Sequence, residues 1–183
     1  MCHAVEAVAS IAATSFTDPY AIEAIRLVFE HLTTAYEKPD DKAARAHMHN
    51  ASALAGMAFT NASLGLVHSL AHKIGGEFGV THGLANAILL PYIIDFNRRS
   101  SDKYALVEKL LGIADLAQAV RDLNRRLGIP ATFKACDEVD FNEAKFKAVL
   151  ERMSANAHAD PCTLTNPGQP TVADVQRIYV AAY

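Results

Sequence analysis

The sequence predicts an all-α protein. Apolar residues recur at intervals of three and four nearly from end to end, which is the period of an amphipathic helix. The alternation of apolar and polar residues that indicates half-buried strands is nearly absent. Capping residues, prolines and glycines mark where the helices begin and end. Because no internal repeat, low-complexity tract or linker interrupts the sequence, we expect a single multi-helix bundle domain over residues 1–183.

The first three expected helices differ in character. The opening segment is rich in alanine and has no capping residue before it. In the second, Asp18 is the expected N-cap and Pro19 the first helical residue. The third becomes rich in small residues, where a neighbouring helix can approach closely, so we expect it to be central and buried. These segments are residues 1–13, 17–36 and 40–65.

Glycine and proline punctuate the later segments. Gly75 and Gly76 weaken one expected helix, and Pro91 is expected to kink or end the helix that starts near His82. Two short helices then close at glycines. The segments are residues 67–78, 82–97, 102–112, 115–128, 140–159 and a last helix from Thr171, with an irregular stretch at 160–170.

Composition excludes several classes of partner. Seventeen basic residues stand against twenty acidic ones, and no basic run exceeds two residues, so the sequence lacks the patch that nucleic acid or anionic lipid requires. No apolar stretch of about 18 residues and no signal peptide is found, so we expect a cytoplasmic protein. The three cysteines form no CxxC motif and are expected to be reduced thiols.

The histidines are the main chemical signal. His68 and His72 are four residues apart on an expected helix, so both rings project from one face. This spacing suits a metal ion, although it is also common on helix surfaces and in satisfied core pairs. His82 follows a glycine-containing bend and can return to the same pocket, and His3 is a fourth candidate. The remaining histidines are expected to be solvated or near a loop: His31, His47, His49 and His158.

Imidazole ligands suit zinc and Fe(II) alike. No HExxH motif is present, and neither His68 nor His72 has a glutamate beside it that could act as a hydrolase base. The nearest carboxylate, Glu6, lies three residues after His3 and is expected to be a helix-surface charge or a cap partner. A zinc hydrolase is therefore the weakest of the candidate functions.

The segment GMAFTNASLGLVHSLAHKIGGEFGVTHGLANAILLP, residues 56–91, resembles the signature of the iron-dependent (group III) alcohol dehydrogenases. That pattern is G-x-x-H-x-x-A-H-x-x-G-x-x-x-x-x-x-H-G-x-x-N-A. In addition, CHAVEAVAS resembles the end of the family's upstream metal motif, D-A-x-x-H-A-x-E, and DPCTLTNPGQP is similar to its C-terminal loop. The resemblance covers nearly the whole chain and is closest to the alcohol dehydrogenase half of bifunctional aldehyde-alcohol dehydrogenases. It implies a dehydroquinate synthase-like helical domain.

The resemblance also implies roles for individual residues. A divalent metal, Fe2+ first and Zn2+ as the alternative, would be bound by His3, His68 and His82. His72 would lie toward the nicotinamide ring and relay a proton, whereas spacing alone makes it a co-ligand of His68. Phe59 and Cys162 would line the substrate pocket, or else be a core aromatic and an incidental loop thiol.

Two family features are missing from the sequence. The fourth metal ligand is an aspartate four residues before the position of His3, and only two residues precede His3 here, so we expect a helix that starts mid-way and a weaker metal site. The Gly-rich turn of an N-terminal NAD(P)-binding α/β domain is also absent. The implied function is the interconversion of a small alcohol and aldehyde with NAD(P), inactive without a partner chain that supplies the cofactor domain. The alternative is a non-catalytic metal-binding or dimerisation module, and either is expected to form a homo-oligomer.

Overall fold

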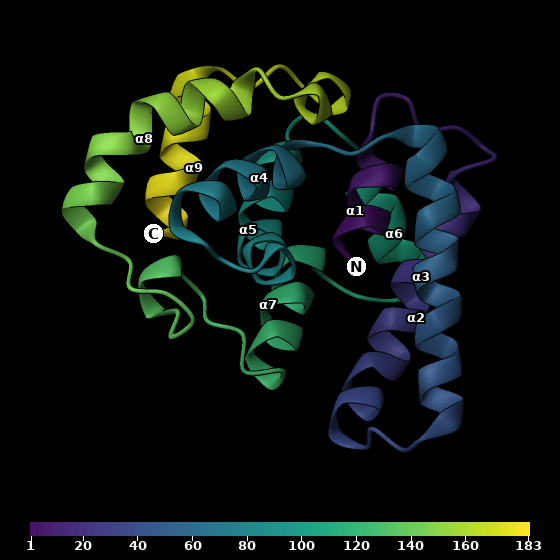
Figure 1. The fold of residues 1–183 in the computed structure, drawn as a ribbon. Coiled ribbons are helices and arrows are strands. Elements are labelled where there is room, and N and C mark those ends of the chain that lie inside the picture. Colours follow the sequence, from purple (N-terminus) through teal and green to yellow (C-terminus); the bar gives the residue numbers. More distant parts are fainter.

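Helices supply all the regular structure of residues 1–183 in the computed structural model (Figure 1). This confirms the predicted all-α class. The α-helices are α1 (Cys2–Ala9), α2 (Asp18–Glu37), α3 (Lys42–Ala62), α4 (Leu66–Phe78), α5 (His82–Asn97), α6 (Lys103–Leu111), α7 (Leu116–Arg126), α8 (Glu143–His158) and α9 (Val172–Ala182). Two short 3-10 helices, η1 (Phe133–Ala135) and η2 (Pro161–Thr165), lie in the loops on either side of α8. None of the helices combines the length and apolarity needed to cross a membrane.

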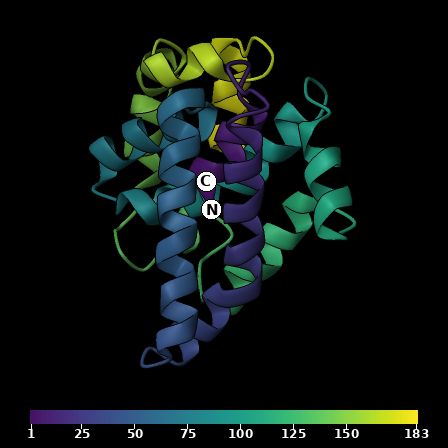
Figure 2. The same cartoon turned by 90° about the vertical axis from the view of Figure 1, so that its right-hand side faces the viewer.

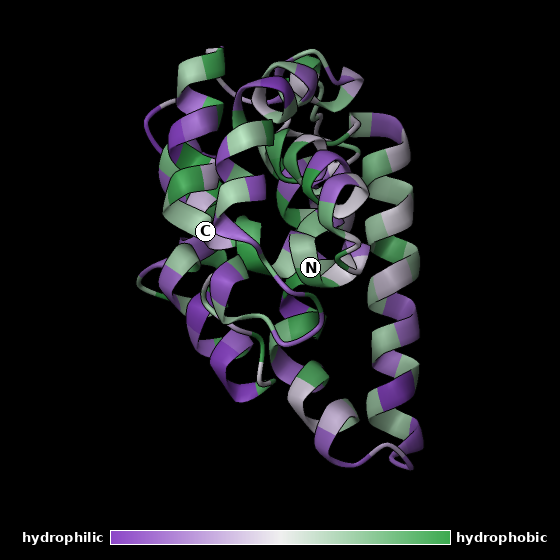
Figure 3. Cartoon of the chain, turned by 60° about the vertical axis from the view of Figure 1, so that its left-hand side comes forward, coloured by the Kyte–Doolittle hydropathy of each residue, from purple (hydrophilic) through white to green (hydrophobic).

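The core is one cluster of 36 buried apolar residues to which all nine α-helices contribute. Helix α5 contributes large aliphatic side chains to this core, among them Ile88, Leu89 and Ile93, each at most 1% exposed. Buried residues occur all round α5, as expected of a helix enclosed by others. The outer helices instead mix hydrophilic and hydrophobic residues along their length, as Figure 3 shows.

The prediction that α3 is a central, buried helix is wrong. Figures 1 and 2 show α3 at the edge of the molecule, beside α2. Its buried residues are alanines only, and they form one stripe against α1 and α2: Ala44, Ala51, Ala55, Ala58 and Ala62. Small side chains allow neighbouring helices to approach closely, but here they cover a single face and leave the opposite face in solvent.

Pro91 does not end α5, which is continuous from His82 to Asn97. A proline inside a helix removes the hydrogen bond to the carbonyl four residues earlier, which here belongs to Ala87. The Asn124 side chain on α7 donates to that carbonyl at 2.7 Å. The neighbouring helix therefore satisfies the acceptor that the proline leaves free.

Several helix boundaries differ from the predicted ones by a few residues. Helix α1 ends at Ala9, and α2 has Thr17 rather than Asp18 as its N-cap. Helix α3 ends at Ala62 because Ser63 adopts a positive φ of 64°. Helix α4 passes through its paired glycines and ends at Phe78, where the C-cap residue Gly79 has a φ of 78° in the left-handed region.

Candidate metal centre

Four histidine rings from three helices meet in one cluster. His3 comes from the first turn of α1, His68 and His72 from α4, and His82 is the first residue of α5. Ring centroids are separated by 4.5 Å between His3 and His68, 5.3 Å between His68 and His82, and 5.5 Å between His72 and His82. The fold thus brings together the four histidines that the sequence analysis selected.

His68 is the buried member of this group. Its side chain is 2% exposed, and its Nε2 atom has no hydrogen-bond partner in the protein. His82 lies at the surface, and its Nε2 accepts a hydrogen bond from the Asn86 side chain at 2.9 Å. The other Asn86 side-chain atom, Oδ1, is buried without a partner. Unpaired buried polar atoms are rare, and these two lie beside the histidine cluster.

Two of the rings are held in the neutral form. Burial, followed by the adjacent His68 and the chain amino group, lowers the pKa of His3 to about 4. The pKa of His82 is lowered by partial burial and by His68 and His72. A neutral imidazole keeps a lone pair on one nitrogen, which is the form that binds a metal ion.

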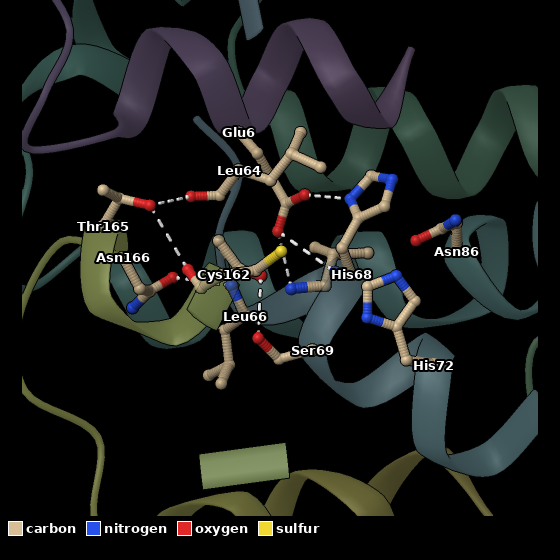
Figure 4. A network of polar contacts seen from close by, with 12 residues as sticks. Glu6, Leu64, Leu66, His68, Ser69, His72, Asn86, Cys162, Thr165 and Asn166 are labelled. Carbon is tan, nitrogen blue, oxygen red and sulfur yellow. Dashed lines mark hydrogen bonds and ion pairs between the residues drawn. The ribbon is translucent and has the colours of Figure 1, made fainter. Parts of the chain in front are cut away.

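Glu6 is not the helix-surface charge that the sequence analysis allowed for. It is 5% exposed and points from α1 to the first turn of α4, as Figure 4 shows. Its Oε1 accepts hydrogen bonds from the backbone N–H of Val67 at 2.6 Å and of His68 at 3.4 Å, and its Oε2 contacts His68 Nδ1. The other expected role, a cap partner, is the one observed, but Glu6 caps α4 and not its own helix.

His72 lies at the outer edge of the cluster, with 40% of its side chain exposed. Its Nδ1 is 3.1 Å from Asp160 Oδ2, an atom that also accepts a hydrogen bond from Lys73 Nζ at 2.7 Å. Burial alone would raise the pKa of Asp160. Hydrogen bonds from Lys73, from the Cys162 backbone N–H and from His72 outweigh burial and hold that pKa well below its usual range. The sequence contains no signal for Asp160 or Lys73. Asp160 is identified by its contact with His72, and Lys73 by its contact with Asp160.

Phe59 and Cys162 each lie beside one of the histidines. The Phe59 ring stacks on His3 with centroids 4.6 Å apart. The Cys162 sulfur lies with one ligand atom each of His72 and Asp160 in a group whose members are within 4.8 Å of one another. Burial, followed by the charge of Asp160, raises the pKa of Cys162 to about 11, so it is a thiol at neutral pH.

A cleft of about 270 Å³ opens beside the cluster and is mainly apolar. Its lining includes His3, His82, Asn86, Leu90, Leu123 and Leu127. The other histidines do not reach it. His31 and His47 stack on each other with centroids 3.9 Å apart, and His49 and His158 are exposed. A small molecule in this cleft would contact two of the neutral imidazoles.

The chain is similar to known proteins over its full length. The sequence profile of the Fe-containing alcohol dehydrogenase family, C-terminal part, matches residues 1–183. The NADPH-dependent butanol dehydrogenase of Clostridium saccharobutylicum is 41% identical, over 100% of this chain and 48% of that protein. The aldehyde-alcohol dehydrogenase of Streptococcus pneumoniae is 37% identical, over 100% of this chain and 23% of that protein. The structure of an iron-containing alcohol dehydrogenase from Thermococcus thioreducens has a TM-score of 0.88 and 34% identity, and the match covers 100% of this chain and 48% of that one. The chain thus spans about half the length of these relatives, or less.

Proposed function

The chain belongs to the Fe-containing alcohol dehydrogenase family as its C-terminal part, and from this premise we propose that it is the metal-binding half of an enzyme that interconverts small alcohols and aldehydes with NAD(P). The observation that carries the proposal is a cluster of three imidazoles from three helices, in which the ring centroids of His3 and His82 lie 4.5 and 5.3 Å from that of His68 and the His68 Nε2 is buried without a protein partner. A buried lone pair on that nitrogen needs either a hydrogen-bond donor or a metal ion.

His3, His68 and His82 are the proposed ligands of a divalent ion, Fe2+ first and Zn2+ as the alternative. Their nitrogen donors suit both metals, and the lowered pKa values of His3 and His82 keep two of the three donors free at neutral pH. The chemistry that such an ion supplies is Lewis acidity toward the oxygen of an alcohol or aldehyde.

His72 is the proposed proton carrier. If its Nδ1–H donates to Asp160, its Nε2 is left as an acceptor on a ring that is 40% exposed, so a hydroxyl proton taken at Nε2 can pass to water. The ionised Asp160 would stabilise the ring while it carries that proton. His72 would face the nicotinamide, and Phe59 and Cys162 would border the substrate beside the metal ligands.

We include NAD(P) in the proposal because the family uses it. We expect a separate nucleotide-binding α/β domain to bind the cofactor. Residues 1–183 contain no strand and therefore no such unit. Activity is expected only when a chain or segment that carries that domain is present. A cytoplasmic location and a homo-oligomeric state remain predictions from the sequence.

Metal analysis of purified variants tests the site. We expect close to one equivalent of Fe2+ or Zn2+ per chain after anaerobic reconstitution and desalting of the wild type, and a loss of most of it in His68→Ala and in His82→Ala. His49→Ala removes an exposed histidine outside the cluster and should retain the metal. Equal metal content in all four samples would contradict the proposed site.

The same samples are assayed for NAD(P)-dependent alcohol oxidation. Turnover that disappears together with the metal supports the dehydrogenase. Stoichiometric metal without turnover, even when the nucleotide-binding half of a relative is added, would favour the non-catalytic metal-binding or dimerisation module.

A further inference from the structure

We propose that Glu6 is a positioning residue that fixes the tautomer of His68: it holds the proton on Nδ1 and so leaves Nε2 as the free lone pair of the site. The inference deepens the proposed function and rests on it for the role of Nε2. The Glu6 carboxylate does not line the cleft, and its hydrogen-bond partners all lie at the start of α4.

Both carboxylate oxygens of Glu6 have partners at the start of α4. The backbone N–H groups of Val67 and His68 both point at Oε1, and backbone amides cannot reverse their roles. The contact between Glu6 Oε2 and His68 Nδ1 needs one proton between the two atoms. A proton on Nδ1 makes the carboxylate the acceptor of all three groups that it faces.

The opposite ring nitrogen of His68, Nε2, is buried. Because Nε2 is buried without a protein partner, a proton there would be a donor with no acceptor. The environments of Nδ1 and Nε2 together select one of the three protonation forms of the His68 ring, the form with a proton on Nδ1 and none on Nε2. In metal sites, a carboxylate behind the histidine commonly fixes the ring in this way.

The backbone around Glu6 leaves room for this contact. A Cβ atom at Gly65 would lie 3.1 Å from Glu6 Oε1, closer than most real contacts, so any larger residue there would press on the carboxylate. The carboxylate also sits at the N-terminus of α4, where the helix dipole favours negative charge. Glu6 thus joins α1, which carries His3, to the helix that carries His68.

Glu6→Gln is the informative change because it replaces one of the two acceptor oxygens by an NH2 donor. If the amide oxygen stays on the two backbone N–H groups, the NH2 meets Nδ1 and favours the ring form with the proton on Nε2. If the amide turns, the NH2 faces the backbone N–H groups and the cap of α4 is lost. Glu23→Gln, on the surface of α2, is the matched control because its side chain is 43% exposed.

The tautomer is read by long-range 1H–15N correlation NMR on chelator-treated protein with 15N-labelled histidine. We expect an Nδ1–H neutral ring for His68 in the wild type and in Glu23→Gln, and loss of this pattern in Glu6→Gln. His72, whose Nδ1 partner is Asp160, serves as the internal reference and should not change. Metal affinity, measured separately, is expected to fall by about 10- to 100-fold in Glu6→Gln.

The spectroscopic and metal-binding results separate the two proposals. A wild-type His68 that carries its proton on Nε2, or on both nitrogens, would overturn the role of Glu6, and this test holds even if Glu6→Gln fails to fold. A Glu6→Gln protein that keeps both the His68 signal and the stability of the wild type would also overturn it, because a turned amide would preserve the signal only by losing the cap of α4. A wild type with the Nδ1–H ring but no bound metal would support the role of Glu6 and refute the proposed function.

Discussion

At the scale of single residues, Asp160 shows how local contacts override burial. Its carboxylate is 6% exposed, yet it accepts hydrogen bonds from Lys73, from the Cys162 backbone and from His72. Burial raises the pKa of a carboxyl group, whereas hydrogen bonds and nearby positive charge lower it, and here the second effect is larger. The ionised carboxylate therefore both holds the η2 loop and orients His72.

This lowered pKa makes the contribution of Asp160 to stability dependent on pH. Because the folded-state pKa lies below the unfolded value of about 3.9, the stabilisation is fully present above that value and is lost as pH falls below it. We expect Asp160→Asn to lower the free energy of unfolding by about 1–3 kcal/mol at pH 7 and by a smaller amount at pH 3, where the unfolded carboxyl is mostly protonated but the folded one is still largely ionised. Urea denaturation at both pH values measures this difference.

Asp95→Asn is the control for that experiment. Asp95 pairs with Arg121 at the surface, where 48% of the Asp95 side chain is exposed, so its loss should change stability by about 0–1 kcal/mol. A loss for Asp160→Asn that is the same at pH 3 and pH 7 would show that the hydrogen bonds do not depend on the charge.

At the scale of secondary-structure elements, α5 and α7 are joined through the irregularity that Pro91 creates. Asn124 of α7 donates to the Ala87 carbonyl, which has lost its helical partner to the proline. The same stretch of α5 follows His82, so the pairing supports the helix that carries one proposed ligand. Asn124 also lines the cleft beside the cluster.

A double-mutant cycle tests this pairing. Asn124→Ala should lower the free energy of unfolding by about 1–3 kcal/mol, because a partly buried acceptor is left without a donor. In a Pro91→Ala background, the new N–H at position 91 can donate to Ala87, and the cost of Asn124→Ala should shrink by about 0.5–3 kcal/mol. Urea midpoints report both values, and Gln118→Ala on the exposed face of α7 is the control. Equal costs in both backgrounds would contradict the pairing.

At the scale of the whole molecule, the site depends on the complete tertiary structure. The proposed ligands come from α1, α4 and α5, and all three helices contribute to the main core cluster. A metal ion bound by them would cross-link segments that separate when the chain unfolds. Binding should therefore stabilise the whole molecule and not one loop.

We expect the thermal unfolding midpoint to rise when Zn2+ is added to the apo protein. A free concentration 100 times the dissociation constant corresponds to about 2.7 kcal/mol of added stability. The shift should vanish in a His68→Ala, His82→Ala double variant and persist in His49→Ala, as followed by circular dichroism. An equal shift in the double variant would place the metal elsewhere, for example at the group of His72, Asp160 and Cys162.

The sequence by itself determined the helical class and the four histidines, because both follow from local spacing. Helical periodicity, caps and glycines act over a few residues, so most segments lie close to where they were predicted. The family motif likewise selected His3, His68, His72 and His82, which the structure brings together.

Only the tertiary structure decided which groups support those histidines and which helix occupies the centre. Glu6 meets His68 across 62 residues of sequence, and Asp160 meets His72 across 88. The edge position of α3 and the continuity of α5 through Pro91 likewise depend on neighbouring helices. Contacts of this kind arise from packing between segments that are distant in the sequence, so the local spacing of residues does not predict them.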